Sequence, residues 1–145
     1  MKASVFYRTA AVLLLLFTVG HTAGFSQPPD PQWGADALVG SMHALHFNVM
    51  GFNRSYWDFF TAAGFSVAVF YVFAAILAWQ LGGLTPANLA RLRITAWAFA
   101  VAFAAITALS CKYLFIIPIV FSSLITLCLT AAASLSGKNI STHPS

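Results

Sequence analysis

The chain has 145 residues, of which 60% are hydrophobic and 7% are charged, and its formal net charge is +4. Soluble domains average about 45–50% apolar and about 25% charged residues, so this composition excludes an ordinary water-soluble fold. The length allows one compact domain rather than two. We therefore predict a single integral membrane domain over residues 1–145, covered by the lipid bilayer. A nucleic-acid partner is not expected, because the sequence has no dense basic cluster.

Four apolar segments reach the length that a helix needs to cross a bilayer, about 17–25 residues. They predict an all-α fold, a bundle of four transmembrane helices. The predicted spans cover about residues 9–24, 59–81, 94–111 and 113–135. Arg8 can extend its charged end to the interface beside the short first span. The last two spans are separated by little more than Lys112, so we expect them to form a tight helical hairpin.

The first span has a competing interpretation. Lys2 and Arg8 precede its apolar run and Thr22-Ala23-Gly24 follows it, a pattern that also fits a secretory signal with a small-residue cleavage site. However, His21 and Phe25 are bulky residues near that site, and three more spans follow. These features favour a helix that is retained in the membrane.

The segment between the first two spans, residues 25–58, is the sizeable polar region of the sequence. It opens with a proline-rich stretch, residues 27–32, which predicts irregular structure. Apolar residues then recur at helical spacing between Asp36 and Met50. These residues are Leu38, Met42, Leu45 and Val49. We predict a short amphipathic helix here, with Asp36 as its N-cap, lying along the outer membrane face or against the bundle.

Helix starts can be read at two further places. Ser55 and Asp58 have the spacing of a capping box, which predicts the start of the second span. Thr85 and Pro86 fit an N-cap followed by the first helical residue, so the third helix should begin near Pro86. That helix carries an alanine at every fourth position, which predicts a face for close helix approach. The alanines are Ala96, Ala100, Ala104 and Ala108.

The basic residues are distributed unevenly between the two sides of the predicted membrane. With a cytoplasmic N-terminus, five lie on the inner side and two on the outer side. The inner residues are Lys2, Arg8, Arg91, Arg93 and Lys138, and the outer ones are Arg54 and Lys112. Cytoplasmic loops of membrane proteins carry an excess of lysine and arginine. This predicts a multi-pass protein of the cell membrane with both termini in the cytoplasm.

Candidate functional residues gather at the outer leaflet and in the loop above it. His21, His46 and Asp58 are candidate catalytic residues, because a histidine paired with a carboxylate can transfer protons. His46 lies on the apolar arc of the predicted loop helix, so we expect it to be buried. Candidate ligand-binding residues are His43, Asn53, Arg54 and Trp57.

Metal binding and a structural role are the alternatives for these residues. His43 and His46, three residues apart, could ligate a metal with Asp58 or His21, but such spacing is common. Bis-histidine haem ligation lacks a second histidine on a span. No metal or cofactor is therefore predicted. In the structural alternative, Asp58 caps its helix and can pair with Arg54. His21 bonds a neighbouring backbone group or lies at the lipid headgroups, and His43 and His46 are interfacial polar groups.

Aromatic residues also gather at the outer end of the second span. They are Phe47, Phe52, Tyr56, Trp57, Phe59 and Phe60. This pattern predicts an interfacial aromatic belt. Stacking on a quinone or a lipid headgroup is the alternative.

Three stretches of the sequence carry a resemblance to known proteins. They are Gly20–Phe25, Gly51–Phe60 and Phe115–Ser122. Over about Arg8 to Ser136 the chain resembles small four-helix bacterial integral membrane proteins that have no assigned function, and more faintly the DoxX-like four-helix proteins. The resemblance implies four spans and a bacterial inner membrane. A faint likeness to the emopamil-binding sterol isomerase class carries over no catalytic residue, because that class uses a glutamate and this chain has none.

Two functional hypotheses follow from the sequence. The leading one is a non-enzymatic membrane component that binds a partner protein or an apolar small molecule at its outer face. The alternative is a membrane enzyme that acts on a lipid-like or quinone-like substrate through the His/Asp cluster. An enzyme requires His21, His46 and Asp58 to converge on one cavity, so their arrangement distinguishes the two.

Overall fold

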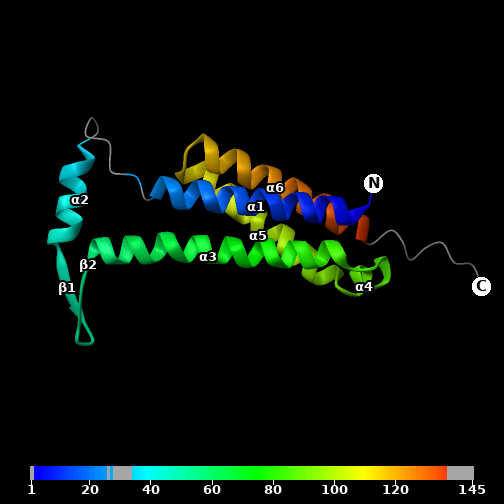
Figure 1. Ribbon diagram of the computed structural model, residues 1–145, viewed down its shortest axis with the longest axis horizontal. Helices are drawn as coiled ribbons and strands as arrows, with labels where there is room; N and C mark the ends of the chain where they lie inside the picture. The colour runs from blue at the N-terminus through cyan, green and yellow to red at the C-terminus, as the bar shows by residue number, and fades with distance from the viewer. Residues whose placement is uncertain (1, 26, 28–33, 137–145) are drawn as a thin grey trace, which may run out of the picture. The chain divides into compact units, whose positions relative to one another are not determined.

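A computed structural model of the chain describes residues 2–25, 27 and 34–136. This part is helical apart from one short β-hairpin, which confirms the predicted all-α fold class (Figure 1). Lys138 and nearly all of the proline-rich stretch lie outside the described residues. The elements in chain order are α1 (Ala3–Phe25), α2 (Ala35–Ala44), β1 (His46–Val49), β2 (Phe52–Ser55), α3 (Tyr56–Gly83), α4 (Pro86–Arg91), α5 (Arg93–Tyr113) and α6 (Ile116–Ser136).

Helices α1, α3, α5 and α6 are each long and apolar enough to cross a membrane. Each of them overlaps one of the four predicted spans, so the multi-pass architecture is as predicted. The helices extend beyond the apolar segments at several ends, because a helix continues past the hydrocarbon core wherever capping and packing support it. The largest extension is at α1, which begins at Ala3 rather than near residue 9.

The chain divides into two compact units, and all four long helices contribute to the first. This unit comprises Met1–Phe17 and Tyr71–Ser145, of which residues 2–17 and 71–136 are described. Its core is rich in alanine, as expected where helices must approach closely in lipid. The largest fully buried side chains are Tyr7, Leu14, Ile125 and Leu129.

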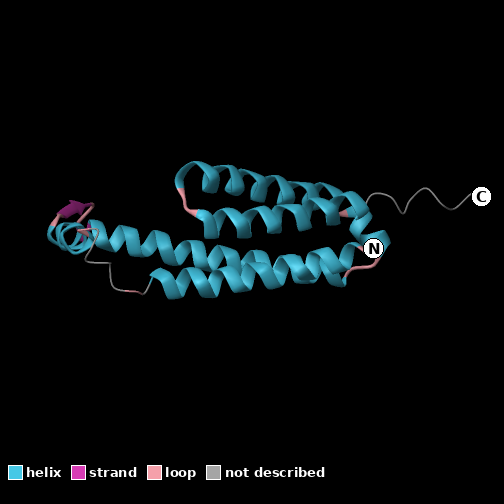
Figure 2. Ribbon diagram, turned by 90° about the horizontal axis from the view of Figure 1, so that it is seen from above, coloured by secondary structure: helices cyan, strands magenta, loops and turns pink. Residues whose placement is uncertain are grey.

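Helices α5 and α6 form the expected hairpin within this unit. Figure 2 shows them side by side, joined by a short loop at Leu114 and Phe115. The Oγ1 atoms of Thr107 and Thr126 are 3.0 Å apart and hydrogen-bond across the pair. A polar contact of this kind fixes the register of two helices that are otherwise apolar.

The predicted alanine face of α5 is correct for its first half and wrong for its second. Ala96 and Ala100 are buried, whereas Ala104 and Ala108 are exposed. The reason is geometric, because a four-residue spacing advances about 40° further around the helix than a full turn. Over three steps the stripe rotates by about 120° and leaves the interface.

Both predicted helix starts are confirmed. The Ser55 N–H donates to Asp58 Oδ2 at 2.8 Å, and the Asp58 N–H donates to Ser55 Oγ at 3.2 Å, which completes the capping box of α3. Thr85 Oγ1 accepts from the Asn88 N–H at 3.4 Å, with Pro86 at the first helical position of α4. The expected single helix from Pro86 is divided, however. Leu92, with φ −92° and ψ 19°, separates α4 from α5.

The second unit, Thr18–Phe70, contains the loop between the first two spans. The predicted helix from Asp36 to Met50 is too long, because α2 ends at Ala44 and a β-hairpin follows. The N-cap of α2 is Gly34 in a left-handed conformation and not Asp36, and it makes no side-chain capping bond. In Figure 1 the two strands connect α2 to the start of α3.

Candidate functional site

The candidate residues lie mostly in the loop segment, which we define as residues 34–60. Its hairpin is an antiparallel pair with the register His46↔Ser55, Phe47↔Arg54, Asn48↔Asn53 and Val49↔Phe52. Directly opposed residues share a face of the ribbon and successive residues alternate between the two faces. One face is therefore polar, and the other carries Phe47, Val49 and Phe52 with Arg54. The hairpin is amphipathic.

The apolar face is covered at one end and open at the other. The Phe47 ring packs against Tyr56 and Phe59 of α3, with ring centroids 5.3 and 4.9 Å apart. Val49 and Phe52 remain exposed at the far end. The Arg54 guanidinium lies over the Phe52 ring, 5.6 Å from its centroid. The anchored end fixes the hairpin to α3, and the open end presents apolar surface.

The hairpin turns through Met50 and Gly51, which have φ values of 53° and 87°. Two positive φ values are the mark of a type I′ turn, where Asn-Gly is the preferred pair. A left-handed backbone costs a residue with a side chain about 1–2 kcal/mol. Met50 adopts this left-handed conformation although it has a side chain, and that side chain is 93% exposed. Local conformation thus favours a different residue at this position.

His46 does not lie where the sequence placed it. It belongs to β1 and not to a helix, and its side chain is exposed, so the expectation of burial is wrong. The error follows from the helical pattern, which assigned His46 to an apolar arc that does not exist. Its Nδ1 lies 3.2 Å from Asn53 Oδ1 on the polar face of the hairpin. Arg54 donates from Nη1 to the Asn53 carbonyl at 2.9 Å.

His43 and Trp57 meet at the junction of α2 and α3. Their ring centroids are 4.8 Å apart, and Trp57 is in turn 5.6 Å from Phe60. Phe60 stacks on Phe25 at 5.0 Å, and Phe25 lies 6.2 Å from His21. Five rings thus run in contact from α2 across the first two turns of α3 to the end of α1. Two of these rings, Trp57 and Phe60, belong to the predicted aromatic cluster and contact each other.

His21 contacts a backbone group of α3. Its Nε2 lies 3.1 Å from the Gly64 carbonyl oxygen of α3. Gly64 leaves room for the Phe25 ring, since a Cβ atom there would lie 2.5 Å from Phe25 Cε2. This is the contact with a backbone group that the structural alternative predicted.

The three candidate catalytic side chains form hydrogen bonds with different residues, although His46 also lies close enough to Asp58 for an electrostatic interaction. Asp58 accepts from the Ser55 N–H, His46 contacts Asn53, and His21 contacts Gly64. Gly64 is six residues after Asp58, which places it about 9 Å further along α3 and on another face. Among the residues that the structure describes, no group of three His, Cys, Asp or Glu side chains could hold a metal ion.

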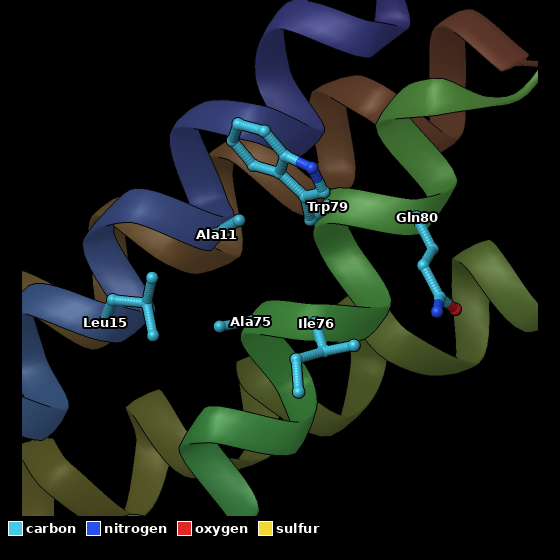
Figure 3. Close-up of a pocket in the computed structure, with 6 residues that line it drawn as sticks. All are labelled: Ala11, Leu15, Ala75, Ile76, Trp79 and Gln80. Atoms are coloured by element: carbon cyan, nitrogen blue, oxygen red, sulfur yellow. The ribbon is translucent and has the colours of Figure 1, made fainter.

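A pocket lies elsewhere, in the first unit, and sequence reasoning missed it. It has a volume of about 270 Å³ and lies between α1 and α3 (Figure 3). Its lining residues are Ala11, Leu15, Ala75, Ile76, Trp79 and Gln80. A hollow between helices depends on how they pack, so the sequence carries little signal for it. Two small residues, Ala11 and Ala75, on facing helices were the available clue.

Comparisons with family models, curated proteins and solved structures give no match to this chain. Function is therefore argued from the geometry of its own residues.

Proposed function

We propose that this protein is a non-enzymatic membrane component that binds a partner protein through its loop segment. The observation that carries this proposal is Met50, a strained and almost fully exposed methionine at the tip of an apolar hairpin face. Strained residues persist where the strain serves a function. Methionine is also enriched at protein interfaces, because its flexible side chain adapts to irregular surfaces.

The surroundings of Met50 extend this apolar surface. Val49 and Phe52 flank the turn, and both are exposed. Helix α2, described in full, has no buried residue, so its Leu38 also remains uncovered. Apolar residues that are grouped and uncovered favour association with another surface. The tip is convex, and a convex apolar element fits a partner's groove better than it encloses a small molecule.

The enzymatic alternative receives no support from these contacts. It needs His21, His46 and Asp58 around one cavity, and the hydrogen bonds of these side chains go to three different groups, Gly64, Asn53 and Ser55. A small apolar ligand at the loop segment would likewise need a concave site. Partner binding needs only the exposed tip.

The proposal includes an orientation, with both termini in the cytoplasm and the loop segment outside. It also includes the inner membrane of a bacterium, in keeping with the resemblance to small four-helix bacterial proteins. The excess of basic residues on the predicted inner side supports the orientation.

Cys111 provides a native probe of this orientation, because it is an exposed thiol near the end of α5. We expect a membrane-impermeant maleimide to label it from outside in spheroplasts. A Cys111→Ser variant should lose this label, since Cys128 lies inside α6. If Cys111 were labelled only after permeabilisation, the protein would have the opposite orientation in the membrane.

A substitution at the hairpin tip separates binding from folding. Met50→Asn should keep or raise thermal stability, because asparagine tolerates the left-handed backbone that methionine resists. It should weaken partner binding at least about 10-fold, as expected for the loss of a buried anchor residue at an interface. The measurement is co-purification of a complex of fixed stoichiometry from native membranes, with the melting temperature as a control.

Asn48→Ala is the matched variant, because Asn48 is exposed on the polar face of the same hairpin. It should leave the complex intact. If Met50→Asn retained the partner as well as Asn48→Ala does, the tip would not be the binding element.

A further inference from the structure

The pocket between α1 and α3 has the form of a lateral groove. Figure 3 shows Ala11 and Leu15 on α1 beside Ala75 and Ile76 on α3, with the Trp79 ring reaching from α3 toward α1. The two alanines are buried and form the floor, whereas Leu15, Ile76 and Trp79 are each about half exposed at the rim. The helices are candidate membrane spans, so an open rim between them faces lipid.

A cation lies at the mouth of this groove. The Arg8 guanidinium carbon is 5.2 Å from the centroid of the Trp79 ring, which itself lines the groove. Arg8, Ala11 and Leu15 follow the i, i+3, i+7 spacing of one helix face. The charged group and the apolar floor therefore belong to one continuous surface.

The position of Arg8 is fixed by its packing. A Cβ atom at Gly82 would lie 3.1 Å from Arg8 Cγ and 3.2 Å from the Ser4 carbonyl oxygen, so the aliphatic part of Arg8 rests on the Gly82 backbone. The guanidinium then stacks over Trp79. A stacked guanidinium keeps its N–H edge free, and that edge matches the geometry of a phosphate.

The charge of the first unit favours an anionic ligand. The unit has no aspartate or glutamate in its sequence, so none of its side chains supplies a carboxylate for Arg8. Arg8 lies five residues after the start of α1 and Trp79 four residues before the end of α3. These spacings correspond to about 6–8 Å, which places the guanidinium near the depth of lipid headgroups.

From these observations we propose that the α1–α3 groove binds one anionic phospholipid. One acyl chain occupies the hollow beside Ala11 and Ala75, and Arg8 binds the headgroup phosphate. The volume is below the range of about 300–1,000 Å³ typical of pockets that enclose a whole ligand, which suits a segment of one chain. The site is independent of the partner-binding role of the loop segment.

Lipid titration of the purified full-length protein in non-ionic detergent tests this proposal, with bound lipid counted by native mass spectrometry. We expect one phosphatidylglycerol to bind about 10-fold more tightly than phosphatidylcholine of the same chains, as expected for one charge-assisted hydrogen-bonded contact. Arg8→Gln should remove this preference. Arg91→Gln, an exposed cation on α4, should retain it. Excess inorganic phosphate should not displace the lipid, because the chain also contributes to binding.

A second pair of variants tests the groove itself. Leu15→Trp fills the hollow and should reduce binding of both lipids several-fold, whereas Val12→Trp, at an equally exposed position outside the groove, should not. Ile76→Trp replaces Leu15→Trp if the latter fails to fold. The proposal would be overturned if Arg8→Gln and Arg91→Gln affected the preference for phosphatidylglycerol over phosphatidylcholine equally. It would also be overturned if a tryptophan at Leu15 or Ile76 left the binding of both lipids unchanged.

Discussion

Leu129→Ala is expected to lower the free energy of unfolding by about 2 kcal/mol. Leu129 lies on α6 in the core of the first unit, with a side chain that is 0% exposed. Buried leucine-to-alanine changes cost about 2–5 kcal/mol in water-soluble proteins. The low end of this range applies here, because in lipid the truncated side chain loses packing contacts but almost no free energy of transfer from water. Denaturant titration in mixed micelles measures the change.

Leu127→Ala is its matched control. Leu127 lies two residues earlier on the same helix and is 66% exposed, so in the membrane its side chain faces lipid. Its truncation should change stability by less than about 0.5 kcal/mol. Equal effects of the two variants would contradict the assignment of the packed face of α6, and with it the core of the bundle.

Gly64→Ala should destabilise the second unit, although alanine is the better helix former. The substitution gains about 1 kcal/mol of helix propensity. Against this, the new methyl group would lie 2.5 Å from Phe25 Cε2. The Phe25 ring is held between Phe60 and Phe65, so it has little room to move. Overpacking costs about 1–3 kcal/mol, so we expect a net loss of about 1 kcal/mol and a lower melting temperature.

Gly24→Ala is the comparison, since a Cβ atom there would have no heavy atom within 4 Å. It should be neutral or stabilising. A Phe25→Ala background should remove the penalty of Gly64→Ala, because the obstructing ring is gone. A penalty that persists in that background would mean that the Phe25 contact is not its cause.

The spans were predictable because length, hydropathy and charge act within each segment. The capping box at Ser55 and the N-cap at Thr85 were predictable for the same reason, because their partners lie three residues away. Such features depend on few residues and no distant contact. Sequence reasoning therefore found the four membrane helices, the start of α3 and the start of the short helix α4.

The hairpin was missed because two periodicities overlap in one stretch. Leu38, Leu45 and Val49 fit a helical period, although the last lies in β1. The strands also lack the usual turn signal, since Met50 occupies the position where asparagine is favoured. Gly51 between alternating residues was the available clue. What decided the structure was pairing between strands, which local propensity does not report.

The candidate site depended even more on tertiary packing. The sequence grouped His21 with Asp58 because both were expected near the outer interface, but depth alone does not bring side chains together. The partner of His21 is the backbone carbonyl of Gly64, and a glycine has no side chain by which the sequence could indicate such a contact. The Arg8–Trp79 contact likewise joins residues about 70 positions apart and required the structure.

The short connection between α5 and α6 bears on how the protein is assembled. Leu114 and Phe115 leave so little chain between the two helices that one cannot cross the bilayer far ahead of the other. Thr107 Oγ1 donates to the Phe103 carbonyl oxygen and accepts from Thr126 Oγ1, so both hydroxyl groups have partners within the hairpin before any other helix is present. The hairpin can therefore enter the membrane as a unit that is already internally paired. Helices α1 and α3 precede the hairpin in the chain and are separated from each other by a long polar segment, so they join it through lateral association within the lipid.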